Sequence, residues 1–306
     1  MHFAHWLSGV AVRDVVTVPM RSIGHSARAA PAAIAAAVCV LAAALADSGH
    51  MAAAQNRLEA EYVASLAGIP IGHGNWVIDI DNDQYAAAAS GATTGLMRFF
   101  SGARGTSASQ GTFNGIQALP TSFAETIDYD RTIDDVRMAM AGGNVKAYSV
   151  EPPPPPHPNR IPVSEADRHG VVDPLSAVFI RVAGNGDPVS PQACGRKVAV
   201  FDGRVRYDLR SEFRRIEMVR ADKGYQGPAV VCSVYFAPIS GYVPDRPVIK
   251  YLVQLRDAEV WLAPISGTRV LVPFRFSMPT PLGTGVLQAT RFVAIQQPPR
   301  PSISAK

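Results

Sequence analysis

The chain has 306 residues, a formal net charge of +4 and 18% charged residues. Because 47% of the residues are hydrophobic, it can bury a core, which excludes a disordered tail. The positive charge is weak and spread along the chain, so the composition gives no reason to expect nucleic-acid binding. Twenty-five glycines and 25 prolines favour a turn-rich β protein over a helical bundle.

Residues 1–54 have the pattern of a leader with a secretory signal peptide. An alanine-rich apolar run covers residues 29–46, Arg21 and Arg28 precede it, and three alanines follow at residues 52–54. A basic start, an apolar stretch and small residues at the cleavage point are typical of exported proteins. We therefore expect cleavage near Ala54, a periplasmic location and no membrane span in the mature chain. The run is near the lower length limit of a span, so an uncleaved anchor is the alternative.

The mature chain alternates apolar and polar residues, which predicts half-buried strands. We expect roughly eleven or more strands, one for each such run, in a single exported β domain over residues 55–306. The predicted fold is mostly β: a curved antiparallel sheet or half-barrel meander with one helix packed across it. The runs lie at residues 58–66, 74–81, 121–129, 136–141, 145–150, 197–201, 204–213, 230–236, 259–263, 270–278 and 282–293.

Two features stand between the strand-rich halves. A proline-rich stretch at residues 152–158 predicts a stiff polyproline II segment, which we interpret as a spacer rather than a ligand for a proline-reading domain. Farther on, Leu175, Val178 and Phe179 recur at helical spacing, and Pro174 suits a first helical position. This pattern predicts a helix over residues 174–182.

The cysteine positions indicate one disulfide. Cys39 lies inside the apolar leader run, so Cys194 and Cys232 remain after cleavage. An even pair of cysteines in an exported chain is most simply a disulfide, because the compartment is oxidising. The alternative is that Cys232 packs as a free, small hydrophobic residue within its apolar strand.

Motifs for catalysis, metals or cofactors are absent from the sequence, so we predict no catalytic residue, metal or cofactor. The mature histidines lie far apart, and neither a serine elbow nor a phosphate-binding loop is present. The densest titratable cluster comprises Glu165, Asp167 and His169. A carboxylate beside a histidine suits acid–base chemistry, which makes an envelope hydrolase the alternative function. The same residues also suit the polar entry to a helix.

Apolar side chains that share the inward strand faces are candidates for an apolar ligand cavity. A strongly curved sheet can leave such a cavity open on its concave side, whereas core packing would fill it. The leading hypothesis is a periplasmic protein that binds an apolar or amphipathic envelope ligand, such as a lipid. The candidate residues are Tyr62, Leu66, Trp76, Ile78, Phe123, Ile127, Met138, Met140, Trp261, Phe274 and Phe276.

Several phrases resemble an uncharacterised family of proteobacterial proteins. They include EYVASLAGIPIGHG at 61–74, VFDGRVRYDL at 200–209 and GPAVVCSVYFAPISGYVPDR at 227–246. Together they resemble the domain-of-unknown-function 3108 family. The resemblance implies an exported protein of mostly antiparallel strands and carries over no catalytic residues. The ending WLAPISGTRVLVPFRF, at 261–276, is similar to the lipoprotein-carrier (LolA/LolB-like) half-barrels, which hold acyl chains against a curved sheet.

Overall fold

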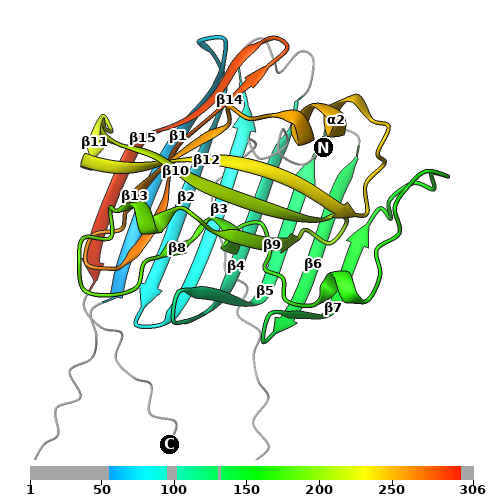
Figure 1. Ribbon diagram of the computed structural model, residues 1–306, viewed down its shortest axis with the longest axis horizontal. Coiled ribbons are helices and arrows are strands. Elements are labelled where there is room, and N and C mark those ends of the chain that lie inside the picture. Colours follow the sequence, from blue (N-terminus) through cyan, green and yellow to red (C-terminus); the bar gives the residue numbers. More distant parts are fainter. Residues whose placement is uncertain (1–54, 95–101, 130–131, 298–306) are drawn as a thin grey trace, which may run out of the picture. The chain divides into compact units, whose positions relative to one another are not determined.

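A computed structural model describes residues 55–94, 102–129 and 132–297 (Figure 1). Within them the fold is mostly β: fifteen strands belong to one curved, largely antiparallel sheet that does not close. The α-helix of these residues is α2, which contacts β12. The predicted leader and its cleavage site lie outside the described residues.

The first seven strands form a meander in which each strand pairs with the next. Short turns join most of them, and Asn82 and Gly142 adopt the positive φ values that tight turns require. The meander confirms the predicted antiparallel pairing in this half. Its strands are β1 (Gln55–Leu66), β2 (Ile69–Asp81), β3 (Gln84–Thr93), β4 (Arg104–Asn114), β5 (Gln117–Asp128), β6 (Ile133–Ala141) and β7 (Asn144–Glu151).

The second half continues the same sheet through β15, which pairs with β1. The strand order from one end to the other is β7-β6-β5-β4-β3-β2-β1-β15-β14-β13-β12-β10-β9, and β8 and β11 add short pairings to β14 and β15. The elements are β8 (Ile180–Arg181), β9 (Lys197–Phe201), β10 (Arg206–Arg220), β11 (Lys223–Gly224), β12 (Gln226–Ser240), α2 (Pro247–Gln254), β13 (Glu259–Pro264), β14 (Val270–Thr280) and β15 (Gly283–Gln297).

The helix predicted over residues 174–182 is wrong. The chain makes one 3₁₀ turn at Ser176–Val178 and then extends into β8, which pairs with β14. Long-range pairing of this backbone with β14 outweighs its helical pattern. The core takes up Leu175 just before the 3₁₀ turn and Phe179, which is extended, just after it. The α-helix lies instead at Pro247–Gln254, where a proline occupies the first turn.

The segment around Val171 and Val172 bridges the two ends of the sheet. The Val171 amide donates to the carbonyl of Gly143 before β7 (2.8 Å), and the Val172 amide donates to Ala199 in β9 (2.9 Å). These bonds carry the chain across the gap between the end strands. The following residues therefore enter the space between the meander and β9–β10.

The predicted disulfide between Cys194 and Cys232 is present, with the two Cα atoms 5.8 Å apart. Cys194 follows the 3₁₀ turn Pro191–Ala193, and Cys232 is fully buried in β12. Both belong to a hydrophobic cluster with Val230 and Leu262. The bridge thus ties the loop after β8 to the middle of β12.

Candidate functional site

Nine of the eleven predicted cavity residues are buried, and Leu66 and Phe276 are half-buried. Seven of them belong to the main hydrophobic cluster, together with other buried residues. The seven are Tyr62, Trp76, Ile78, Phe123, Met138, Met140 and Phe274. Trp261 is not among these seven. It packs in a separate cluster with Val231, and the guanidinium groups of Arg215 and Arg275 lie 5.5 and 4.7 Å from the centre of its ring.

Residues 171–179 form the bridging segment, and their side chains pack against the inward face of the meander. The ring of Phe179 stacks on Trp76, with centroids 5.9 Å apart, and meets Tyr85 edge-on at 5.1 Å. Leu175 and Phe201 are fully buried in the same cluster. The sequence analysis did not place Leu175 and Phe179 between the strands, because it assigned them to a helix packed across the sheet.

A buried polar cluster lies within this packing. Asp173 is 0% exposed, and its carboxylate accepts bonds from the hydroxyls of Ser109 (2.9 Å) and Ser176 (2.6 Å) and from two backbone amides, those of Leu175 and Ser176. The Tyr85 hydroxyl lies 2.7 Å from Ser176 Oγ. Burial raises the pKa of Asp173, and the bonds from Ser176 and Ser109 oppose that rise. The cluster therefore anchors the bridging segment to β3 and β4.

A second acidic group lies where the β9–β10 turn meets the meander. Glu125 pairs across β5–β6 with buried Val136, and a side chain at Gly203 of the turn would collide with that valine. The turn also carries Asp202 and Arg204. Burial, followed by the charge of Asp202, raises the pKa of Glu125 to about 7. Glu125 is the strongest candidate proton donor or acceptor among the described residues.

We expect the stability of the protein to fall as pH rises from about 4.5 to about 7. The unfolded chain releases the Glu125 proton near pH 4.5, whereas the folded protein holds it to about pH 7. Glu125→Gln should remove the Glu125 contribution to this fall, leaving that of Asp173, and raise the free energy of unfolding at pH 8 by roughly 2–3 kcal/mol. Urea unfolding at pH 5 and pH 8 measures both effects. Exposed Glu165→Gln is the control, and equal pH profiles for wild type and Glu125→Gln would contradict the prediction.

The outward face of β3 to β7 carries a shallow groove of about 690 Å³. Alternate residues of these strands, such as Phe123 and Met138, pack in the core although they also border the groove, and the residues between them face outward. Small side chains form much of the groove floor and leave the strand backbones accessible. They are Ala86, Ala108, Ala124, Ala139 and Ala147, with Ser122, Ser149, Gln110 and Arg137 as polar lining.

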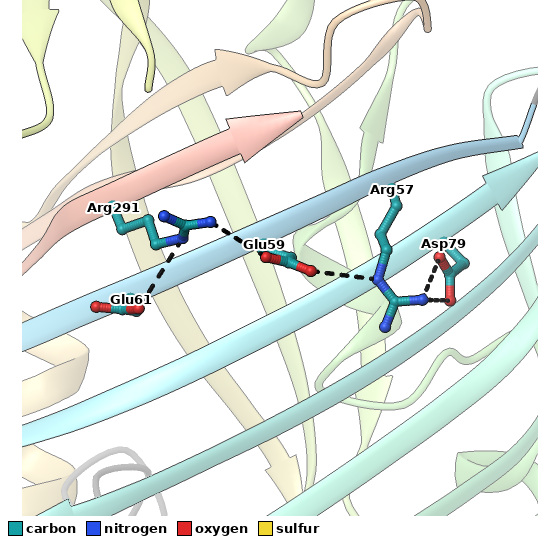
Figure 2. A network of polar contacts seen from close by, with 5 residues as sticks. All are labelled: Arg57, Glu59, Glu61, Asp79 and Arg291. Carbon is teal, nitrogen blue, oxygen red and sulfur yellow. Dashed lines mark hydrogen bonds and ion pairs between the residues drawn. The ribbon is translucent and has the colours of Figure 1, made fainter. Parts of the chain in front are cut away.

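Part of the outward face beyond the groove is charged instead. Figure 2 shows a network across β15, β1 and β2 in which Arg291 contacts Glu59 (3.3 Å) and Glu61 (3.9 Å). Arg57 in turn contacts Glu59 (3.7 Å) and Asp79 (3.3 Å). Such partly exposed pairs contribute little stability, about 0–1 kcal/mol each. They do, however, keep this part of the face hydrated and set it apart from the alanine-lined groove.

Comparisons with known proteins establish the family. The family described as "Protein of unknown function (DUF3108)" matches residues 61–290. The chain belongs to this family. A crystal structure of a beta-barrel-like protein of domain of unknown function DUF1849 from Brucella abortus aligns with a TM-score of 0.40 and 8% identity, covering 80% of this chain and 98% of that one. No curated protein matches the sequence.

The Glu165, Asp167 and His169 side chains of this DUF3108 chain do not contact one another through any hydrogen bond found in the described residues. Asp167 accepts bonds from the amide and hydroxyl of Ser164 (2.8 and 2.7 Å), which lower its pKa. His169 Nδ1 lies 2.9 Å from Asn144 Oδ1. Each of these two groups therefore has a separate local partner.

Two negative findings apply to residues 55–94, 102–129 and 132–297 of this DUF3108 chain. These ranges contain no cluster of three histidine, cysteine or acidic side chains placed to hold a metal ion. They also contain no helix with the length and apolar character needed to cross a membrane.

Proposed function

We propose that this protein is an exported envelope protein that binds a ligand with a long apolar chain in the groove outside β3–β7. The observation that carries the proposal is the groove itself, because its volume of about 690 Å³ is in the range typical of small-molecule sites. The buried disulfide supports export, because structural disulfides persist in oxidising compartments.

The groove suits an extended chain because a row of residues that are small except for Gln110 runs from strand to strand. Ala86 pairs with Gln110, Gln110 with Ser122, Ser122 with Ala139, and Ala139 with Ala147. This row crosses four strand spacings, about 19 Å at about 4.8 Å each, which matches a long acyl chain lying across the strands. Methyl groups and exposed backbone on this floor allow close contact along the chain.

The polar lining suits a head group. The Arg137 guanidinium lies at the groove and already contacts Asp135 (3.0 Å). Ser149 pairs with Arg137 across β6–β7, so a hydroxyl and a guanidinium lie together at one end of the row of small residues. An amphipathic ligand would place its apolar chain over the alanines and its head group here.

We expect Ala139→Trp to weaken binding of the fluorescent fatty acid cis-parinaric acid by at least about tenfold, because the indole would fill the groove. Fluorescence titration of the purified protein measures the affinity. Ala141→Trp is the matched control, since Ala141 is also exposed on β6 but lies outside the groove. Absence of binding by the wild type, or equal affinities for Ala139→Trp and the wild type, would overturn the proposal.

A further inference from the structure

β10 leaves much of one edge without a strand neighbour. β9 pairs with it only from Arg206 to Arg210, and the last backbone bonds on that side join Ser211 to Gly195 and Arg196. Beyond Ser211, no strand among the described residues pairs with this edge, although β10 continues to Arg220. Unpaired amide and carbonyl groups on such an edge are a template for another strand.

The free part of this edge exposes large apolar side chains on one face. Phe213 is 42% exposed, Ile216 49% and Met218 68%. A bulge at Arg214 keeps the three on the same face, since they pair with alternate residues of β12 at positions 232, 230 and 228. Exposed apolar groups gathered on an unpaired edge mark an interaction surface.

We propose that this edge joins two copies of the chain, antiparallel and about a two-fold axis at Ile216, into one continuous sheet. In this register Ile216 lies opposite Ile216 of the second copy, and Arg215 lies opposite Glu217. Past the bulged Arg214, Phe213 lies opposite Met218. Apolar groups therefore meet apolar groups and opposite charges meet, as a self-complementary two-fold interface requires.

The charges select this register. A two-fold axis at Arg215 would place the two copies of Arg215 opposite each other. An axis at Glu217 would place the two copies of Glu217 opposite each other. Both registers therefore put like charges face to face. When the axis lies at Ile216, the Arg215 and Glu217 side chains of both copies form a group of four with no net charge. This group lies on the face opposite the apolar residues. Within one chain Arg215 already contacts Glu217 (2.9 Å) and also Glu259 of β13 (2.8 Å), so its guanidinium already lies beside carboxylates on this face.

Cysteine cross-linking tests the register. Directly opposite residues have Cβ atoms about 4.5–5.5 Å apart, so Ile216→Cys should form a disulfide-linked dimer under mild oxidation. Met218→Cys is the matched control. In the proposed register the two copies of residue 218 are four residues apart along the paired strands, a distance of roughly 13 Å. Non-reducing electrophoresis reads out both variants. Failure of Ile216→Cys to cross-link, or equally fast cross-linking of Met218→Cys, overturns the proposal.

Light scattering after size-exclusion chromatography tests association independently. The wild type should be a dimer, and Ile216→Lys should be a monomer because two lysines would meet on the two-fold axis. Leu282→Lys is the control: Leu282 is 75% exposed but lies in the β14–β15 turn, away from β10. A monomeric wild type at every concentration up to the solubility limit, or an Ile216→Lys variant that remains dimeric, overturns the proposal.

Discussion

Replacing Cys194 and Cys232 together with alanine should lower the free energy of unfolding by about 4 kcal/mol. The disulfide closes a loop of 38 positions, and its removal lets the unfolded chain sample many more conformations. In the folded protein both sulfurs are buried in one hydrophobic cluster, so the replacement also removes packing around Val230 and Leu262. Urea unfolding of the double variant beside the oxidised wild type measures the loss.

Reductant provides the control for this prediction. Dithiothreitol should shift the urea midpoint of the wild type most of the way to that of the double variant, and it should leave the double variant unchanged. A difference below about 1 kcal/mol between oxidised wild type and double variant would contradict the prediction, because it would mean that the loop is already restricted in the unfolded chain.

Asp173→Ala should destabilise the protein by about 3–5 kcal/mol. The carboxylate accepts bonds from two hydroxyls and two backbone amides at a position with no solvent access. Removing it leaves the Ser109 hydroxyl and the amides of Leu175 and Ser176 buried without this acceptor, and each stranded group costs about 1–3 kcal/mol. The bridging segment should then detach from β3 and β4, which hydrogen exchange of its amides would show.

Asp187→Ala is the matched control for Asp173. The Asp187 carboxylate also accepts a bond from a backbone amide two residues on, that of Val189 (2.8 Å), but the residue is exposed. Its loss should cost about 1 kcal/mol or less, because water replaces the missing acceptor. Equal losses for the two variants would mean that burial of Asp173 contributes nothing to its effect.

The alternation of apolar and polar residues predicted those strands in which large apolar side chains alternate with polar ones. β1, with Leu58 and Tyr62 inward, and β6, with Val136 and Met138 inward, follow this pattern. β3 and β4 were not predicted, because alanine, serine and glycine dominate them and have weak strand preference. Pairing with β2 and β5 on either side holds them in the sheet.

The candidate groove could not be predicted from sequence for the same reason. Alanines such as Ala124 and Ala139 give no sign of function in isolation, and only the register places them in adjoining rows on one face. Glu125 is equally inconspicuous in sequence. Its raised pKa arises from burial and from the charge of Asp202, which lies in the β9–β10 turn far away along the chain.

The sequence by itself determined the β character of the chain, the antiparallel direction of neighbouring strands and the pairing of Cys194 with Cys232. These follow from the alternation of apolar and polar residues along the strands and from the presence of only two cysteines after residue 54. Only the tertiary structure decided how the inward face is filled and that residues 174–182 are not a helix. Both depend on Leu175 and Phe179 meeting strands far away along the chain, and such long-range contacts outweigh local preference.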